Sequence, residues 1–505
     1  MSESIARSCA RRREAVPRGR GRWIAAIVLA SSPAPLVTAA VPVPTVSGPI
    51  TSPGSAFITP PSTLDWSSSG YVEEEFFVAG TATAYTATAA LGSDGMWTAS
   101  TGDTAPYVTR ILVRRPVNPK KFNGTVVVEW LNVSGGLDGA PDWTFAHTML
   151  LREGFAWVGV SAQLVGVAGG SSPLGLNLSL KAVNPVRYGP LSHPGDSFSY
   201  DMFSQVAQAL RLPAGVAPLG GLRPRRVLAI GESQSAFRLV TYINAVHPLA
   251  RVYDGFLVHS RGGGGAPLSQ SPQPSIAAPT PTFIRTDVDV PVLTFETETD
   301  LITLGFLPAR QPDTRHIRTW EVAGTSHYDV YGLIVGPDDP GPAAMDTTYL
   351  PPMTSAFGGI ISCARPVNAG PQHYVLSAAL YRLHRSARAG RAQGAGAPRM
   401  EITAGTPPDI ERDALGNARG GIRTAQVEAA VATLSGLGQT GSAFCSIFGT
   451  TTPFDAVTLA TLYPSHAAYV SRVLDATRNA VRAGFVLKAD ANAIKAAAAA
   501  SDVGR

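Results

Sequence analysis

The sequence predicts an α/β protein with a mostly parallel central sheet flanked by helices. Short, strongly apolar runs of strand composition alternate along the chain with runs of helical spacing, which is the order expected of parallel strands joined by crossover helices. The composition supports a large core, because hydrophobic residues make up 45% and charged residues only 15% of the 505 residues. The 51 glycines and 41 prolines indicate many turns and loop insertions between these elements.

The first expected elements are an extended arm over residues 41–70, rich in Pro, Ser and Thr, and a β-rich segment over 71–115. The later strands are mostly apolar, as in residues 125–128 (TVVV), which is typical of strands buried on both faces of a parallel sheet. Such strands are predicted over 124–131, 155–161, 226–230, 253–259, 290–296 and 317–322, and helices over 197–212 and 234–246.

Two stretches rich in Gly and Pro interrupt this alternation. Residues 262–281 predict an insertion on the surface, and residues 386–410 indicate that a C-terminal extension begins at about residue 386. We therefore expect a single domain over residues 41–505, which combines the N-terminal β arm, the central α/β fold, the insertion and the extension.

Residues 1–40 have the features of a secretory signal peptide. They contain a positive region from Arg11 to Arg22, a short apolar segment over 23–30 and a small-residue cleavage site over 37–40. The apolar segment is shorter than the ~20 residues that span a bilayer, and no later segment is a long uncharged apolar run. We therefore expect export to the periplasm or the extracellular space, and no membrane span.

The net positive charge of the chain comes entirely from the same segment. The formal net charge is +5, and residues 1–40 contain seven arginines and two glutamates. The rest of the chain carries 34 basic and 34 acidic residues, so composition gives no support to a nucleic-acid partner.

Two of the three cysteines lie outside the predicted signal peptide. Cys9 would leave with that peptide, and Cys363 and Cys445 would remain. An even pair in an exported protein predicts a disulfide, with two buried free thiols as the alternative. Neither cysteine has the spacing of a metal site or of a redox-active pair.

The segment most informative about function is residues 226–239, RVLAIGESQSAFRL. A strand runs into GESQS (residues 231–235) and continues directly into a helix, which is the layout of a nucleophile elbow. The sharp turn requires small residues two positions before and after the serine. Gly231 fits, and Ser235 is small although glycine is usual there. A serine that merely caps the helix is the alternative, but the correct strand and helix on either side favour Ser233 as a nucleophile.

His327 is the expected base for this nucleophile. In a fold of this kind the base and an acid follow the serine in the order Ser, Asp/Glu, His. His327 comes shortly after the predicted strand over 317–322. Because the carboxyl ends of parallel strands meet at one edge of the sheet, we expect His327 on the same edge as Ser233.

The acid is expected in ETETD, at the end of the predicted strand over 290–296. Asp300 is favoured because it lies where the turn after a strand normally delivers the acid. Glu298 is the competing candidate, and Glu296 is expected to remain in the strand. Metal binding by these three carboxylates is an alternative, but no histidine shares their spacing, so we expect no metal site. A serine mechanism needs no cofactor.

The oxyanion of an acyl-transfer intermediate requires two backbone N–H donors. The amide of Gln234, directly after the nucleophile, is the first. The second is expected from Val133 or Ser134 in the glycine loop over 132–136 (NVSGG), because glycines let a loop approach the substrate closely. An ordinary turn is the alternative for this loop.

Several segments resemble a family of large exported bacterial proteins within the α/β-hydrolase superfamily, the α/β-hydrolase domain proteins. The resembling segments are VVVEWLNVSGG, YGPLSHPGDSFSYD, IGESQSA, ETETD, VAGTSHYD, CARPVNAGPQHYV and LGNARGGIRTAQVEAAVATLSG, which span about residues 120–470. The resemblance implies the α/β-hydrolase fold and hydrolase activity, with Ser233 and His327 as catalytic residues. It is compatible with either Asp300 or Glu298 as the acid.

The sequence therefore predicts an exported serine hydrolase that cleaves small-molecule or polymeric carboxylic esters through Ser233, Asp300 and His327. A peptidase or an acyltransferase with the same triad is the alternative enzyme, and the rates on chromogenic esters and amides distinguish these. A binding protein of the hydrolase fold without catalysis is the alternative of another class. The complete set of serine, acid and histidine argues against it, and labelling by a fluorophosphonate would decide the question.

Overall fold

The central sheet of the computed structural model has ten strands within the described residues, which are 41–51, 53–170, 172, 175 and 177–505. The strand order from edge to edge is β10-β9-β8-β7-β4-β5-β3-β2-β1-β6. The strands are β1 (Thr45–Ser47), β2 (Tyr71–Ala87), β3 (Ala99–Pro116), β4 (Thr125–Trp130), β5 (Ala156–Val160), β6 (Ala214–Gly215), β7 (Arg226–Glu232), β8 (Gly255–His259), β9 (Val292–Thr297) and β10 (Ile317–Val322). The signal peptide predicted over residues 1–40 lies outside the described residues.

The six strands from β10 to β5 are parallel, and β3, β2 and β1 pair antiparallel in turn. The mostly parallel sheet predicted from the sequence is therefore confirmed, and the six apolar runs form strands that differ from the predicted bounds by at most two residues. The chain leaves β4 towards β5 and leaves β7 towards β8, on the other side. Such a reversal opens a crevice at the carboxyl ends of the two central strands.

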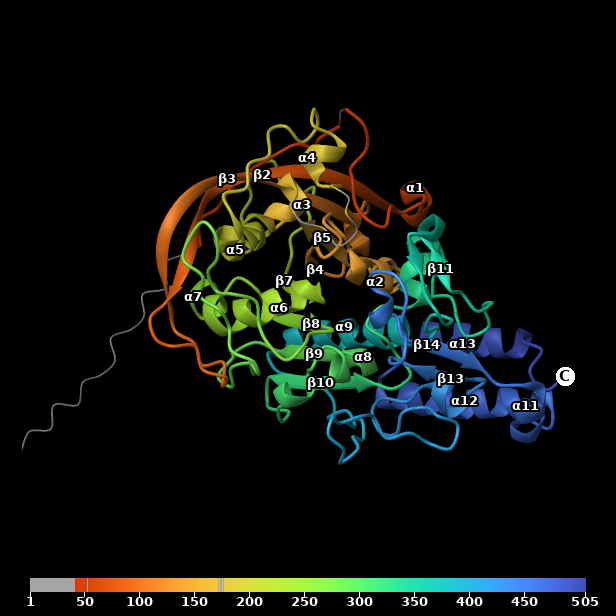
Figure 1. Ribbon diagram of the computed structural model, residues 1–505. Helices are drawn as coiled ribbons and strands as arrows, with labels where there is room; N and C mark the ends of the chain where they lie inside the picture. Colours follow the sequence, from red (N-terminus) through yellow and green to blue (C-terminus); the bar gives the residue numbers. More distant parts are fainter. Residues whose placement is uncertain (1–40, 52, 171, 173–174, 176) are drawn as a thin grey trace, which may run out of the picture. The chain divides into compact units, whose positions relative to one another are not determined.

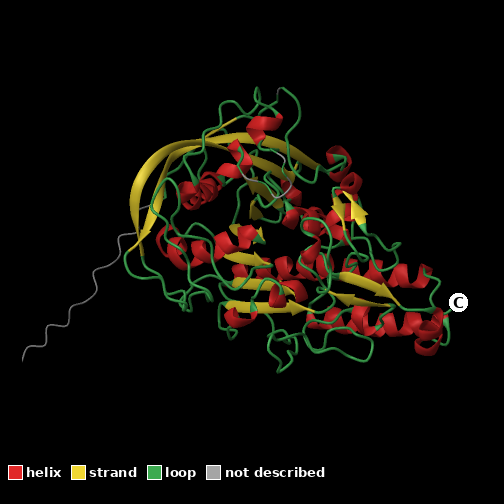
Figure 2. Ribbon diagram, viewed as in Figure 1, coloured by secondary structure: helices red, strands yellow, loops and turns green. Residues whose placement is uncertain are grey.

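Helices cover both faces of this sheet, as Figure 2 shows. One face carries α5 (Ser199–Arg211) and α6 (Gln234–Thr241), which continues as a π-helical turn (Tyr242–Val246). The other carries α2 (Pro141–Arg152), α9 (Gln372–Ala389), α12 (His466–Ala483) and α13 (Lys488–Ala500). Shorter elements are α1 (Trp66–Ser69), α3 (Leu164–Ala168), α4 (Leu180–Val183), α7 (His247–Ala250), α8 (Glu298–Ile302), α10 (Ala425–Glu428), α11 (Ala456–Leu462) and the strand pairs β11 (Ser355–Ala356) with β12 (Ile361–Ser362) and β13 (Ala432–Ser435) with β14 (Thr450–Pro453).

The N-terminal β arm is a long antiparallel pair. β2 and β3, drawn in orange in Figure 1, curve along the antiparallel side of the sheet, where a β-rich segment was predicted over 71–115. β3 also pairs with β5, so the arm continues the central sheet directly. Its residues Ile111 and Val113 are fully buried in the core on the α5 and α6 face.

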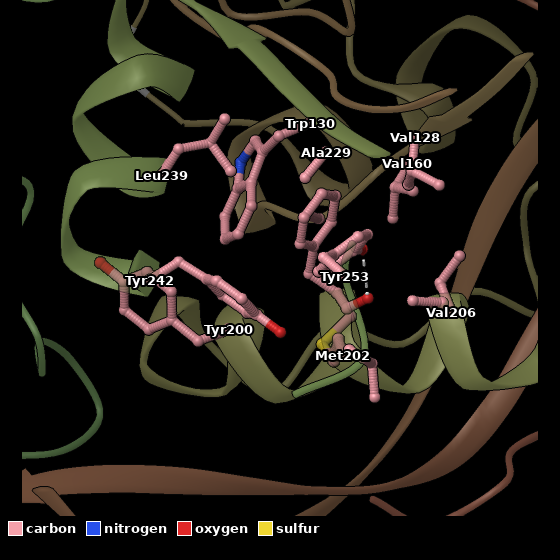
Figure 3. Close-up of a cluster of buried hydrophobic side chains, with 14 of the residues drawn as sticks. Val128, Trp130, Val160, Tyr200, Met202, Val206, Ala229, Leu239, Tyr242 and Tyr253 are labelled. Carbon is pink, nitrogen blue, oxygen red and sulfur yellow. Dashed lines mark hydrogen bonds between the residues drawn. The ribbon is translucent and has the colours of Figure 1, made fainter. Parts of the chain in front are cut away.

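The core on this face is rich in aromatic side chains whose polar atoms are satisfied. Figure 3 shows Trp130, Tyr200, Tyr242 and Tyr253 in this cluster, together with Leu239 of α6. The Tyr253 hydroxyl donates to a backbone carbonyl at 2.8 Å, and the Tyr200 hydroxyl to another at 2.7 Å. A buried tyrosine normally requires such a partner. The packing therefore fixes α6, and with it the turn at the end of β7.

The C-terminal segment completes the opposite face of the core. Val473 of α12 and Ile494 of α13 are buried in the same cluster as Trp320 of β10. Ile422 forms a parallel bridge to Val322, at the end of β10. The expected extension from about residue 386 therefore packs onto the central fold. It buries the apolar face of the sheet that would otherwise be exposed to water.

The prediction of a surface insertion over 262–281 is wrong for its first half. Residues 271–281 are mostly exposed or half-buried, but Gly262 and Gly263 are buried. A Cβ on Gly262 would lie 2.5 Å from the Leu304 carbonyl oxygen, and a Cβ on Gly263 would lie 2.5 Å from that of Gly305. Glycine is therefore required at both positions, because the neighbouring backbone leaves no room for a Cβ atom.

The disulfide predicted between Cys363 and Cys445 is confirmed, with the two Cα atoms 5.5 Å apart. Both cysteines belong to a small separate hydrophobic cluster that also contains Leu333 and Phe448. In the part of the chain that the structure describes, no helix has the length and apolar character needed to cross a membrane.

Candidate active site

Ser233 lies on a sharp turn between β7 and α6. Its backbone angles, φ 57° and ψ −121°, belong to a region that non-glycine residues rarely adopt. A Cβ on Gly231 would lie 3.0 Å from the Cβ of Ser235, so the residues on either side of the turn pack against each other and must be small. The Ser233 amide donates to the His259 carbonyl at 2.9 Å. The strand, turn and helix of the predicted elbow are therefore present.

His327, which follows β10, contacts both of its predicted partners. Its Nε2 lies 2.8 Å from Ser233 Oγ, and its Nδ1 lies 2.6 Å from Asp300 Oδ1. The His327 amide donates to Thr299 Oγ1 at 3.2 Å, and its carbonyl accepts from Gln372 Nε2 at 3.3 Å. The ring is buried and held at both nitrogens. This arrangement favours the tautomer with a proton on Nδ1, which leaves Nε2 facing the hydroxyl.

Asp300 is oriented by the start of α8. Thr297 caps this helix, and its amide and hydroxyl both donate to Asp300 Oδ2 at 2.7 Å. The reciprocal bond from the Asp300 amide to Thr297 Oγ1 completes a capping box. One carboxylate oxygen therefore anchors the side chain and the other faces His327. The T-x-x-D pattern of the sequence is the signal that predicts this box.

Glu298 and Glu296, the other two candidate acids, lie elsewhere. Glu298 Oε1 accepts from the Gly324 amide at 2.7 Å, and its Oε2 accepts from Arg412 Nη2 at 3.0 Å. It thus joins the turn before His327 to the C-terminal segment. Glu296 remains within β9, as expected, and burial raises its pKa well above the usual value.

Glu232 is a second carboxylate beside His327, and sequence reasoning missed it. Its Oε1 lies 3.1 Å from His327 Nε2, the same nitrogen that faces Ser233 Oγ. Asn132 Nδ2 donates to its Oε2 at 3.0 Å. The signal for this residue is its position, because the last residue of β7 directly precedes Ser233 in the sequence.

Burial raises the pKa of Glu232 to about 7, and four charged or titratable side chains modify it. His327 and His259 lower this pKa, while Asp142 and Asp300 raise it further. Burial by itself lowers the pKa of His327, but the carboxylates of Glu232 and Asp300 act in the opposite direction, and the net change is upward. The buried carboxylates of Glu232 and Asp300 therefore both favour the protonated form of the His327 ring.

A buried polar network lies next to the site, and no pattern in the sequence predicts it. His259 Nδ1 lies 2.8 Å from Asp142 Oδ1, and its Nε2 lies 3.0 Å from Gln372 Nε2. Burial lowers the pKa of His259 to about 4, so its ring is neutral near pH 7. The same Gln372 nitrogen contacts the His327 carbonyl. These residues come from α2, β8 and α9, which are far apart in the chain.

The predicted oxyanion loop, residues 132–136, follows β4 and is tied to the Ser233 turn. Asn132 Nδ2 donates to the Glu232 carbonyl at 3.1 Å, in addition to its bond to the carboxylate. The Ser134 amide donates to Asn132 Oδ1 at 2.7 Å. Gln234 is the first residue of α6, so its amide has no acceptor within the helix.

Ser233 and His327 face a cavity of about 390 Å³, a volume typical of small-molecule sites. Asn132 and Ser134 line it, and its other walls are mostly apolar. In the described residues, no group of three or more His, Cys, Asp or Glu side chains is arranged to hold a metal ion.

The chain is similar to several known proteins. One solved structure that the chain resembles is assigned as a dienelactone hydrolase from Klebsiella pneumoniae, with 13% identity over 48% of this chain and 85% of that chain and a TM-score of 0.25. Another is an α/β serine hydrolase without a lid from Xanthomonas campestris, with 14% identity over 49% of this chain and 86% of that chain and a TM-score of 0.26. No curated protein matches the sequence. Residues 39–496 match the family described as alpha/beta hydrolase domain, and because this match covers most of the sequence, the chain belongs to that family.

Proposed function

We propose that the protein is a serine esterase, which cleaves carboxylic esters through an acyl-enzyme on Ser233. The observation that carries this proposal is the continuous pair of hydrogen bonds from Asp300 through His327 to Ser233. A serine hydroxyl is a weak nucleophile unless a base removes its proton, and the base in turn requires a group that orients it. All three side chains follow the carboxyl ends of parallel strands, where the crevice opens.

In the first half of the reaction, His327 Nε2 takes the Ser233 proton as Oγ forms a bond to the ester carbonyl carbon. The tetrahedral intermediate then collapses, the bond to the alcohol oxygen breaks, and His327 gives its proton to the departing alcohol. In the second half, water loses a proton to His327 and adds to the acyl carbonyl. The acid departs, and the proton returns to Ser233 Oγ. Asp300 holds the Nδ1–H tautomer and stabilises the imidazolium.

The oxyanion of each intermediate is stabilised by backbone amides. Gln234 provides one, at the N-terminal end of α6. The second is Val133 or Ser134 in the loop after β4. The Ser134 amide already donates to Asn132 Oδ1, so its use requires that this bond be exchanged for one to the oxyanion. Aligned donors that need no reorganisation are the strongest source of catalysis of this type.

Export is part of the same proposal. The disulfide between Cys363 and Cys445 supports it, because disulfides persist in oxidising compartments and are rare in reducing ones. We place the active protein in the periplasm or outside the cell, with residues 1–40 as the signal peptide.

The purified protein is expected to react with a fluorophosphonate probe and to hydrolyse 4-nitrophenyl acetate. Tryptic mass spectrometry should locate the probe on Ser233. A 4-nitroanilide of the same acyl group should react much more slowly, because an amine is a poorer leaving group than a phenol. Labelling without turnover of any ester would contradict the esterase assignment, and faster turnover of the anilide would indicate a peptidase.

The substitution Glu232→Gln is expected to move the acid limb of the kcat/KM pH profile to lower pH. In the wild type, Glu232 stabilises a proton on His327 Nε2, the atom that must be free to accept the Ser233 proton. Removal of a neighbouring carboxylate lowers the pKa of a cation by about 1–3 units. The pair titrates as a unit, so the quantity to compare is the apparent pKa of the limb.

The measurement is kcat/KM for 4-nitrophenyl acetate from pH 5 to 9 for both proteins. Glu428→Gln is a suitable control, because Glu428 lies on α10 in an exposed ion pair with Arg423. In the control variant, the apparent pKa of the acid limb should equal that of the wild type. A limb that does not move in Glu232→Gln would show that Glu232 does not act on His327 and only packs beside it.

A further inference from the structure

Two short segments provide much of the apolar lining of the cavity beside Ser233. Both lie outside the central sheet, and they are 80 or more residues apart in the sequence. The first wall consists of Phe357, Ile360 and Ile361, and the second wall consists of Phe444, Ile447 and Phe448.

One aromatic residue in each wall has an unusual backbone conformation. Phe357 has φ 51° and Phe444 has φ 70°. Within the described residues, five non-glycine residues have positive φ, and three of these, the two phenylalanines and Ser233, line the cavity. A bulky residue keeps such a conformation only where the surrounding structure imposes it. The backbone at both phenylalanines is therefore set by its surroundings.

The two walls are joined to each other and to the catalytic turn. The disulfide Cys363–Cys445 connects them covalently, and the Ala364 amide donates to the Thr440 carbonyl at 2.8 Å. The Tyr328 amide, next to His327, donates to the Ile447 carbonyl at 3.3 Å. These bonds connect both walls to the turn that carries His327.

The cavity offers apolar surface, and no lysine or arginine is among its described lining residues. Phe357 and Ile360 are 50% and 54% exposed, although large apolar side chains are normally covered. Of its described lining residues, only Glu232, His327 and Tyr328 are titratable, and none is lysine or arginine. An anionic group in the cavity would meet no lysine or arginine there and would face the carboxylate of Glu232.

From these observations we infer that the first and second walls bind an uncharged apolar group of the substrate, on one side of the scissile ester bond. The substrates are therefore neutral esters with an extended aliphatic or aromatic group, and not esters whose group in this cavity is a sugar or an ionised acid. This inference rests on the proposed function, since it assigns a substrate class to the same site. Burial of each additional methylene group should raise kcat/KM about fourfold until the cavity is filled.

The test compares two series of esters on the wild-type protein. In the first, 4-nitrophenol is constant and the acyl group extends from acetyl to butyryl, hexanoyl and octanoyl. In the second, the acetyl group is constant and the alcohol extends from ethanol to butanol, hexanol and octanol, with acid release followed by pH-stat. In one of the two series, kcat/KM should rise about fourfold for each added methylene group. 4-Nitrophenyl hemisuccinate, which carries a negative charge, should react more slowly than 4-nitrophenyl butyrate. A flat profile in both series, or a preference for the hemisuccinate, would overturn the inference.

The substitution Ile360→Ser tests the walls directly. It should lower kcat/KM for the longest favoured ester about tenfold more than for the acetyl ester, because a missing apolar contact in a pocket has an effect of this order. Leu212→Ser is the matched control, since Leu212 is 60% exposed and does not line the cavity. An equal chain-length profile in wild type and Ile360→Ser would contradict the assignment of the walls.

The fluorophosphonate separates this inference from the proposed function. If Ser233 is labelled and acetyl esters are cleaved while chain length has no effect, the esterase assignment stands and the inference fails. If Ser233 is not labelled and no ester is cleaved, the proposed function fails and the inference fails with it.

Discussion

The variant Ser233→Ala is expected to fold normally and to lose ester hydrolysis by a factor on the order of 10⁴ or more. The loss is large because no other group can form the acyl-enzyme, while the alanine leaves the packing of the turn unchanged. The variant should also fail to react with the fluorophosphonate. The measurement is kcat for 4-nitrophenyl acetate with purified protein, together with a thermal unfolding curve that establishes the fold.

Ser235→Ala is the matched control for this experiment. Ser235 lies two residues away on the same turn, and it is not among the residues that line the cavity. Its activity should stay within about threefold of the wild type, since Ala removes no contact to the reacting atoms. Substantial activity in Ser233→Ala, at a level that contaminating enzyme does not explain, would refute the mechanism.

The second large effect is expected for Asp300→Asn, which should lower kcat on the order of 10³–10⁴-fold. An amide beside His327 Nδ1 does not hold the ring in the tautomer that leaves Nε2 free. Glu298→Gln should have little effect on kcat, because Glu298 binds the Gly324 amide and Arg412 and does not contact His327. It should instead lower the free energy of unfolding by about 1–3 kcal/mol, through the loss of charged hydrogen bonds in a buried place.

The pair of variants separates the two roles of these neighbouring carboxylates. Turnover per folded molecule is measured for both, and urea unfolding gives the change in stability. Asp300→Asn also removes part of the capping box at α8, so a modest loss of stability is expected there too. The reverse order, with turnover lost in Glu298→Gln and kept in Asp300→Asn, would transfer the role of the acid to Glu298.

The central fold could be predicted because its signals are local. Each buried parallel strand is an apolar run such as 125–128, and the position of the turns at strand ends follows from the parallel order alone. The same argument led to Ser233, His327 and Asp300 as neighbours, although the sequence left Glu298 open as the acid. The disulfide followed from the count of cysteines and the expected compartment.

The features of the structure that the sequence did not predict depend on contacts between segments that are far apart in the chain. The network of Asp142, His259 and Gln372 draws on three elements, and no spacing within the sequence connects them. Gly262 and Gly263 look like loop residues, since composition does not reveal that a second backbone segment lies against them. The apolar walls of the cavity belong to this class as well, because their residues meet only after the C-terminal segment folds back.

The backbone conformation of Ser233 has a consequence for the stability of the whole molecule. A non-glycine residue in this region costs on the order of 1–3 kcal/mol, whether or not a substrate is present. The free energy of unfolding of a single domain is only about 5–15 kcal/mol, so the strain at this one residue is a noticeable fraction of it. The aromatic core beneath α6 and the satisfied hydroxyls of its tyrosines offset this cost. The thermal stability of the protein and the backbone geometry at Ser233 are thus coupled through the core that packs beneath α6.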